Sequence, residues 1–118
     1  MIKPLTYKGT FKYLDWINKI EDPDMTPDKV MAEIQKGTFK ALLCDDVGIL
    51  IYWPKGIIAW IIWFYTLPNK GRSLVESIYD YLRGEGFKKV RAGSIRKEKG
   101  FMRITGMTKL FTIYEKEL

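Results

Sequence analysis

The chain has 118 residues, of which 47% are hydrophobic and 14% aromatic, as expected for one folded domain spanning residues 1–118 and not for a disordered chain. It contains no histidine and one cysteine, Cys44, which excludes His-based triads, His or thiolate metal sites and internal disulfides. Any general acid or base must then be a carboxylate, Tyr, Lys or water. Met1–Asp15 lacks the apolar stretch of a signal peptide, so a cytoplasmic location is expected.

The net charge of +6 is confined to the second half of the chain. Residues 1–65 carry 8 Lys and 8 Asp or Glu, whereas residues 66–118 carry 12 Lys or Arg and 6 Asp or Glu. This asymmetry indicates an anionic partner, such as nucleic acid, a phosphorylated cofactor or an acidic protein. The alternative is that the charge serves solubility alone.

The N-terminal part predicts helices after a candidate first strand at Ile2–Thr6. Apolar residues at helical spacing predict an amphipathic helix within residues 6–24, which an Asp-Pro-Asp sequence ends. A second helix is expected to start with Thr26 as N-cap and Pro27 in its first turn, and to end at Gly37.

Three apolar runs follow, at residues 40–46, 47–54 and 56–66. Their length suggests a membrane span, but Pro54-Lys55-Gly56 leaves runs shorter than the ~20 residues that a spanning helix needs. We therefore expect two buried strands that turn at Pro-Lys-Gly. Cys44 is expected to be a buried small hydrophobe, with a nucleophile as the alternative. Asp45-Asp46 is expected to form a turn between strands, and metal binding by this pair is the less favoured alternative.

Aromatic residues are concentrated in the second and third of these runs. Core packing is their default explanation, and a hydrophobic channel or partner surface is the alternative. The aromatic residues concerned are Trp53, Trp60, Trp63, Phe64 and Tyr65.

The C-terminal part predicts a helix from Ser73 that ends at Gly84 and Gly86. A strand at residues 87–94, a short basic helix within residues 94–107 and a strand at residues 109–118 complete the order α-α-β-β-β-α-β-α-β. This order predicts an α/β fold with a mixed sheet.

The loop before this helix has the layout of an anion site, because a strand, a turn and a glycine-containing helix start follow one another from Tyr65 to Ser73. Gly71 lets the backbone approach phosphate oxygens, and Lys70 and Arg72 add positive charge. Neither the Walker pattern GxxxxGK[ST] nor the dinucleotide pattern GxGxxG is present. An ordinary helix start is the alternative.

These features resemble the GNAT superfamily of acetyl-CoA-dependent N-acetyltransferases, whose core is a strand, an [RQ]xxGx[GA] loop and a helix. Gly71 falls on the last loop glycine, Leu74 follows 3 residues later, and Gly86-Phe87 follows 15 residues later. FMRITGM, residues 101–107, is similar in outline to the family's FYxKxGF helix. The resemblance covers Lys40 to Leu118, and the chain looks closest to short, degenerate GNAT-like proteins of tailed phages.

The resemblance implies a three-layer fold with a central mixed, mostly antiparallel sheet and helices on both faces. It also implies acetyl-CoA as co-substrate and an amine as acceptor. The pantetheine arm would lie between the fourth and fifth strands, and the loop would hold the pyrophosphate. The cofactor-binding positions carried over are Phe64, Tyr65, Thr66, Asn69, Lys70, Gly71, Arg72 and Ser73.

Several positions depart from the family pattern. Thr66 occupies the usual Arg or Gln position, and Asn69 occupies the first loop glycine, although Asn tolerates a left-handed backbone. Met102 stands where many members have a tyrosine that protonates the departing thiolate, for which Tyr114 or Tyr65 are candidate substitutes. The fourth strand has no carboxylate that could act as a base.

Three functional hypotheses follow. The first is an N-acetyltransferase that uses acetyl-CoA. The second is a non-catalytic GNAT-fold protein with a structural, virion-associated or interaction role. The third is a small nucleic-acid-binding domain, based on 8 Lys or Arg against 2 Glu between Arg83 and Arg103.

Overall fold

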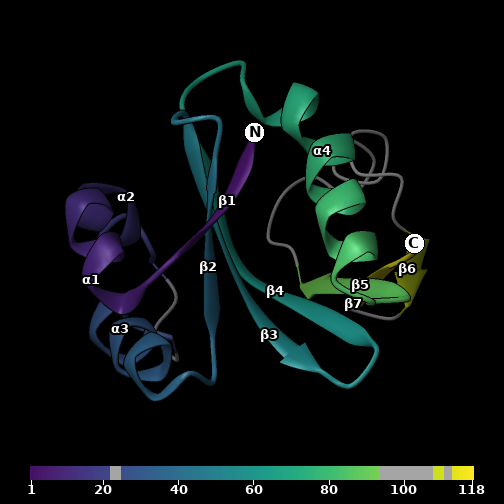
Figure 1. Cartoon of the computed structure of the whole chain (residues 1–118), viewed down its shortest axis with the longest axis horizontal. Coiled ribbons are helices and arrows are strands. Elements are labelled where there is room, and N and C mark those ends of the chain that lie inside the picture. The colour runs from purple at the N-terminus through teal and green to yellow at the C-terminus, as the bar shows by residue number, and fades with distance from the viewer. Residues whose placement is uncertain (22–24, 94–107, 111–112) are drawn as a thin grey trace.

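The computed structural model describes residues 1–21, 25–93, 108–110 and 113–118. These residues form one mixed sheet with strand order β1-β2-β3-β4-β5-β7-β6 (Figure 1). The β4–β5 pair is parallel, and the other described pairs are antiparallel. The strands are β1 (Ile2–Leu5), β2 (Lys40–Cys44), β3 (Gly48–Lys55), β4 (Ile58–Thr66), β5 (Lys89–Gly93), β6 (Thr108–Leu110) and β7 (Ile113–Glu117).

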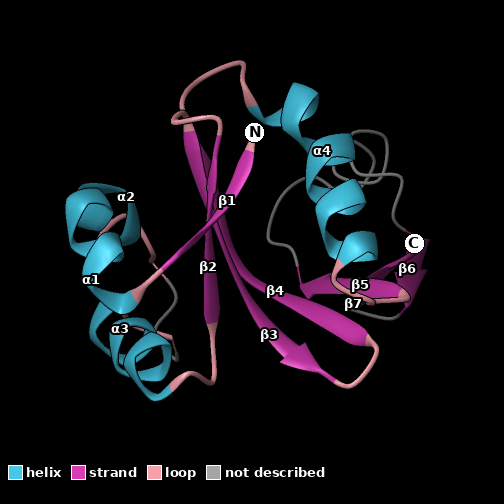
Figure 2. Cartoon of the chain, in the orientation of Figure 1, coloured by secondary structure: helices cyan, strands magenta, loops and turns pink. Residues whose placement is uncertain are grey.

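Helices cover both faces of the sheet, as the resemblance implied (Figure 2). Three helices lie on one face and α4 lies on the other, so the predicted three-layer α/β fold is confirmed. In the described part of the chain, no helix is long and apolar enough to cross a membrane. The helical elements are α1 (Tyr7–Thr10), the 3₁₀ turn η1 (Phe11–Tyr13), α2 (Leu14–Ile17), α3 (Pro27–Lys36) and α4 (Gly71–Gly84).

The N-terminal helices follow the sequence only in part. α3 starts after the N-cap Thr26, whose side chain accepts a hydrogen bond from Lys29 N–H, and ends at left-handed Gly37, as expected. The expected single helix at residues 6–24 is instead the succession α1, η1 and α2. Tyr13, with φ −119° and ψ 21°, leaves the helical region, and its ring stacks on Trp16 with centroids 5.2 Å apart.

Period-two alternation along the central strands divides the core into two layers. Leu42 and Leu50 pack against α4, whereas Ala41 and Ile49 pack on the face of α1–α3. Cys44 is 0% exposed in the α4 layer, and burial raises the pKa of its thiol to about 12. The expected buried small hydrophobe is confirmed.

Two tight turns connect the central strands. Asp45 and Asp46 both have positive φ, and Val47 N–H donates to Cys44 O at 3.0 Å, which confirms the expected turn. The hairpin of β3 and β4 is also confirmed, but it turns at residues 56–57, one residue later than expected. Pro54 of β3 pairs with Ala59 of β4. Proline is tolerated at this position because β2 does not pair with β3 beyond Tyr52, so one edge of β3 is free at Pro54.

Candidate functional site

Within the described residues, the two parallel strands pair along only part of β4. β5 pairs with β4 only from Ile58 to Ile61, and the last pair is Ile61 with Ala92. β4 continues to Thr66 in register with β3. Among the described strands, none pairs with residues 62–66 on the side of β5. This edge of β4 is therefore unpaired among the described residues, and the region beside it is called the gap between β4 and β5 below.

A β-bulge in β4 directly follows its last described pair with β5. Ile51 lies opposite Trp63 and Tyr52 lies opposite Ile61, so Ile62 is the extra residue in the ladder. Ile62 and Trp63 consequently both pack on the α1–α3 face, although they are consecutive. A bulge bends its strand and increases the local twist. The bulge thus changes the course of β4 directly after its last described pair with β5.

The free edge of β4 presents backbone groups to this gap. Leu67 N–H donates to Val47 O at 2.8 Å, which shows that Leu67 directs its backbone toward β3. Because this orientation alternates along an antiparallel pair, Tyr65 also bonds to β3, and Phe64 and Thr66 direct their N–H and C=O groups to the opposite edge. An extended ligand with amide groups can hydrogen-bond to such an edge.

The turn after β4 leads into an open helix N-terminus. Asn69 has φ 65°, the left-handed conformation that its residue type tolerates. Ser73 Oγ donates to Lys70 O at 3.0 Å, and no side chain among the described residues caps the first N–H groups of α4. The N–H groups of Gly71, Arg72 and Ser73 have no intrahelical partner and lie at the positive end of the helix dipole, where an anion is stabilised.

The helix start packs directly on the strand end. A Cβ atom on Gly71 would lie 3.3 Å from Thr66 Oγ1 and 4.0 Å from Phe64 Cε2. All eight positions carried over from the family thus lie on one strand–turn–helix unit, with Phe64 on the α4 face. Tyr65 is on the other face, where its ring centroid is 5.9 Å from that of Trp16.

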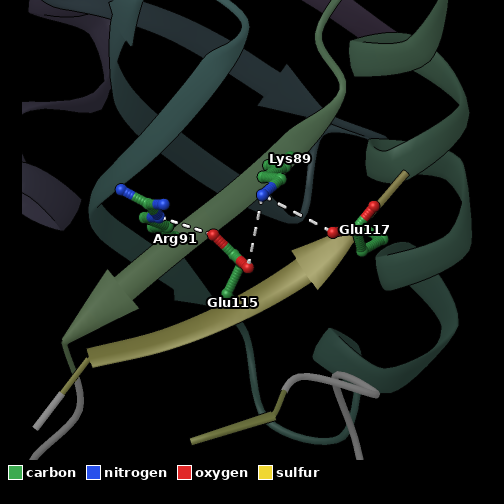
Figure 3. Close-up of polar contacts among 4 residues, drawn as sticks. All are labelled: Lys89, Arg91, Glu115 and Glu117. Atoms are coloured by element: carbon green, nitrogen blue, oxygen red, sulfur yellow. Dashed lines mark hydrogen bonds and ion pairs between the residues drawn. The ribbon is translucent and has the colours of Figure 1, made fainter. Parts of the chain in front are cut away.

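Two cations of β5 are paired with carboxylates of β7. Arg91 Nε is 2.6 Å from Glu115 Oε1, and Lys89 Nζ is 3.8 Å from Glu115 and 3.6 Å from Glu117 (Figure 3). Arg83 at the far end of α4 pairs with Asp80 at 2.5 Å. The cations beside the open helix start, Lys70 and Arg72, are exposed. The basic residues expected in a short helix within 94–107 lie outside the described residues.

The structure separates the two candidate substitutes for the family's tyrosine. Tyr114 is buried in the core beneath α4, whereas Tyr65 is half-buried on the free part of β4, with Lys19 Nζ 5.7 Å from its ring centroid. Tyr114 pairs with Ala92, the β5 partner of Ile61, whereas Tyr65 lies on β4 beyond the last described pair with β5. Burial raises the pKa of Tyr79 to about 12, with a smaller contribution from the charge of Glu76. Met102 lies outside the described residues.

Two features of the site were not predicted from the sequence. The bulge at Ile62 is hidden because β4 is apolar on both faces, so a change of alternation leaves no pattern in the residue types. A groove on the α1–α3 face, lined by Trp53, Trp60 and Ile62, is formed by segments distant in sequence. The aromatic content of β3 and β4 was the only signal that pointed to it.

Solved structures of acetyltransferases share this architecture. E. coli YhbS, a GNAT family N-acetyltransferase in complex with CoA, is 12% identical with a TM-score of 0.76, and the match covers 99% of this chain and 80% of that chain. The E. coli ribosomal-protein-S18-alanine N-acetyltransferase is 11% identical with a TM-score of 0.75, covering 99% and 92%.

The PaiA N-acetyltransferase of Thermoplasma acidophilum in complex with CoA is 14% identical with a TM-score of 0.64, covering 100% of this chain and 98% of that chain. No protein-family model and no curated protein sequence matches the chain. The similarity extends over the full length at low identity, and it shows that the chain has the GNAT acetyltransferase fold.

Proposed function

We propose that the protein is an N-acetyltransferase that binds acetyl-CoA at the gap between β4 and β5. The observation that carries this proposal is the combination of a free strand edge with an open helix N-terminus at the same end of the sheet. The first suits the amides of a pantetheine arm, and the second suits a pyrophosphate. Two of the structurally similar acetyltransferases were solved with CoA.

In this proposal each part of the unit has a defined role. Phe64 and Thr66 hold the pantetheine arm through their backbone groups. The N–H groups of Gly71 and its two successors bind the pyrophosphate, and Lys70 and Arg72 add charge. The phosphates of the co-substrate are then the anionic partner that the basic half of the sequence predicts.

The chemistry is a direct transfer at the gap. The neutral amine attacks the thioester carbonyl, a C–N bond forms, and the C–S bond breaks. The amine loses its proton to water, since β4 carries no carboxylate. The leaving thiolate takes a proton from water or from Tyr65. A cytoplasmic location accompanies this proposal, either in a host cell or, for a phage protein, in the virion. The resemblance to phage proteins stays a prediction.

A GNAT-fold protein without catalysis is the second candidate. Thr66 and Asn69 replace residues of the family loop, and Met102 replaces its tyrosine. The open strand edge and helix start would remain in such a protein, whose role would be structural, virion-associated or in an interaction with a partner, with or without bound CoA. Nucleic-acid binding ranks below both because Lys89 and Arg91, within the basic segment, already pair with carboxylates.

Calorimetric titration with CoA and acetyl-CoA tests the proposal. We expect CoA to bind, and we expect Arg72→Ala to weaken this binding about tenfold, or ~1.4 kcal/mol. This is at the low end of the ~1.5–3 kcal/mol of a hydrogen bond to a charged group, because the Arg72 side chain is exposed. Arg83→Ala is the matched control, because Arg83 pairs with Asp80 at the opposite end of α4 and should leave binding unchanged. Absence of CoA binding at millimolar concentration would refute the enzyme and favour the non-catalytic protein.

A release assay for free thiol separates the two candidates. The enzyme should produce free CoA from acetyl-CoA faster in the presence of an amine than in its absence. CoA binding without amine-dependent release, across a panel of amines, would favour the non-catalytic protein.

A further inference from the structure

A groove lies on the α1–α3 face of the sheet. It has a volume of about 650 Å³ and lies between α3 and the hairpin of β3 and β4. Phe39, Trp53, Trp60 and Ile62 supply its apolar lining. Ile62 is also the bulge residue, directly after the last β4–β5 pair. The groove therefore reaches the residue that follows the last described β4–β5 pair.

The wall of the groove is a pair of tryptophans held in place from both sides. Trp53 and Trp60 are direct cross-strand neighbours, and Trp53 is 36% exposed. The Arg91 guanidinium lies 5.5 Å from the centre of the Trp60 ring and is fixed by Glu115. Two adjacent indole rings offer a large apolar surface with little freedom left to lose, which suits an aromatic or branched apolar ligand.

The charges around the groove are mainly positive. Lys29 and Lys36 line it, and Lys55 Nζ lies 5.0 Å from the centre of the Trp53 ring. Glu33, the one carboxylate among the described lining residues, is 3.4 Å from Lys36. A ligand with several ammonium groups would meet like charges along its length, whereas a neutral body would not.

We propose that this groove binds the body of the acceptor, and that the acceptor is a monoamine on an aromatic or branched apolar body. This inference rests on the proposed function for its amine chemistry. Phe64 packs against the cluster of the α4 face, which includes the buried Leu74. In this proposal the amine approaches from the groove side, and polyamines and Lys-rich peptides are poor acceptors.

Binding of the amine can be measured without turnover, by NMR of the indole N–H signals of the 4 tryptophans. The probes are phenethylamine and, as a polycation of similar length, spermidine. We expect phenethylamine to shift the signals of Trp53 and Trp60 and to leave that of Trp16 unchanged, and spermidine to shift neither of the first two. Equal binding of both amines, or shifts confined to Trp16, would overturn the inference.

Two variants and a control sharpen the test. Trp53→Ala should weaken phenethylamine binding about tenfold, on the scale of one aromatic contact with its buried area. Ile57→Ala is the control, because Ile57 is 54% exposed in the same hairpin and does not line the groove. Lys36→Glu should raise the affinity for spermidine relative to phenethylamine. No change in this ratio would contradict the charge argument.

The same samples keep the two proposals apart. If CoA binds and phenethylamine does not shift the groove tryptophans, the acceptor inference fails and the proposed function stands. If phenethylamine binds with the expected dependence on Trp53 but CoA does not bind, the proposed function fails and the groove remains an amine-binding site.

Discussion

Gly71 lies where α4 meets the end of β4, and its lack of a side chain has a direct structural reason. An added Cβ would lie 3.3 Å from Thr66 Oγ1, closer than side chains usually approach. A branched side chain would press further on Thr66 and Phe64. The helix start and the strand end would then move apart, although both must face the same ligand.

We predict that Gly71→Val weakens CoA binding by about tenfold or more, equivalent to the ~1–3 kcal/mol of an overpacked contact. Calorimetry measures the affinity, and circular dichroism checks that the fold is retained. Gly84→Ala is the control at the other end of α4, where a Cβ meets nothing within 4 Å. It should bind CoA normally and gain ~0.5–1 kcal/mol of stability from helix propensity. Unchanged binding in Gly71→Val would show that this helix start is not a phosphate site.

At the scale of the element, β4 performs two tasks with one strand. Up to Ile61 it pairs with β5, and beyond the bulge it pairs with no described strand on that side. The single extra residue Ile62 marks the change. The geometry of the gap thus depends on the length of the strand as much as on the identity of its side chains.

Deletion of Ile62 should remove the bulge and keep the sheet. Ile61 and Trp63 would become neighbours on opposite faces, which restores the alternation of a regular strand. We expect the pairing with β5 to extend toward Thr66 and CoA binding to be lost. Hydrogen exchange of β4 amides and a CoA titration measure the two effects. Ile62→Ala keeps the bulge and should bind CoA; loss of binding in that variant would assign the role to the side chain.

At the scale of the whole molecule, the core buries acidic groups that must stay neutral. Burial raises the pKa of Cys44 from 9.0 to about 12. It also raises the pKa values of Tyr52 and Tyr79 from 10.0 to about 12, with smaller contributions from neighbouring groups. In each case the folded state keeps its proton at a pH where the unfolded chain has lost it. The resulting stability is complete below about pH 9 and is lost as pH rises toward 12.

We therefore predict alkaline destabilisation that begins near pH 9. By pH 10 the thiol alone should reduce the free energy of unfolding by about 1 kcal/mol. Urea denaturation at a series of pH values measures this decrease. In Cys44→Ala the decrease should begin about one pH unit higher, where the tyrosines take over. An identical pH profile in both proteins would mean that the thiol does not contribute.

Much of the fold followed from local sequence patterns. The caps Thr26 and Gly37 specified α3 because they satisfy the ends of a helix within a few residues. The Asp45-Asp46 turn and the hairpin after it followed for the same reason. The long helix expected at residues 6–24 failed, because Tyr13 leaves the helical region and stacks on Trp16, and neither fact is visible in the spacing of apolar residues.

The sequence by itself determined the strand–turn–helix unit that ends at Ser73, since its residues are neighbours in the chain and each has a clear backbone preference. Only the tertiary structure decided that the described β4–β5 pairing ends at Ile61. It also decided that Glu115 pairs with Arg91 and that Trp53 and Trp60 line a groove. These depend on strand register and on contacts between segments far apart in sequence. An apolar strand that is compatible with either face carries no local signal for its register.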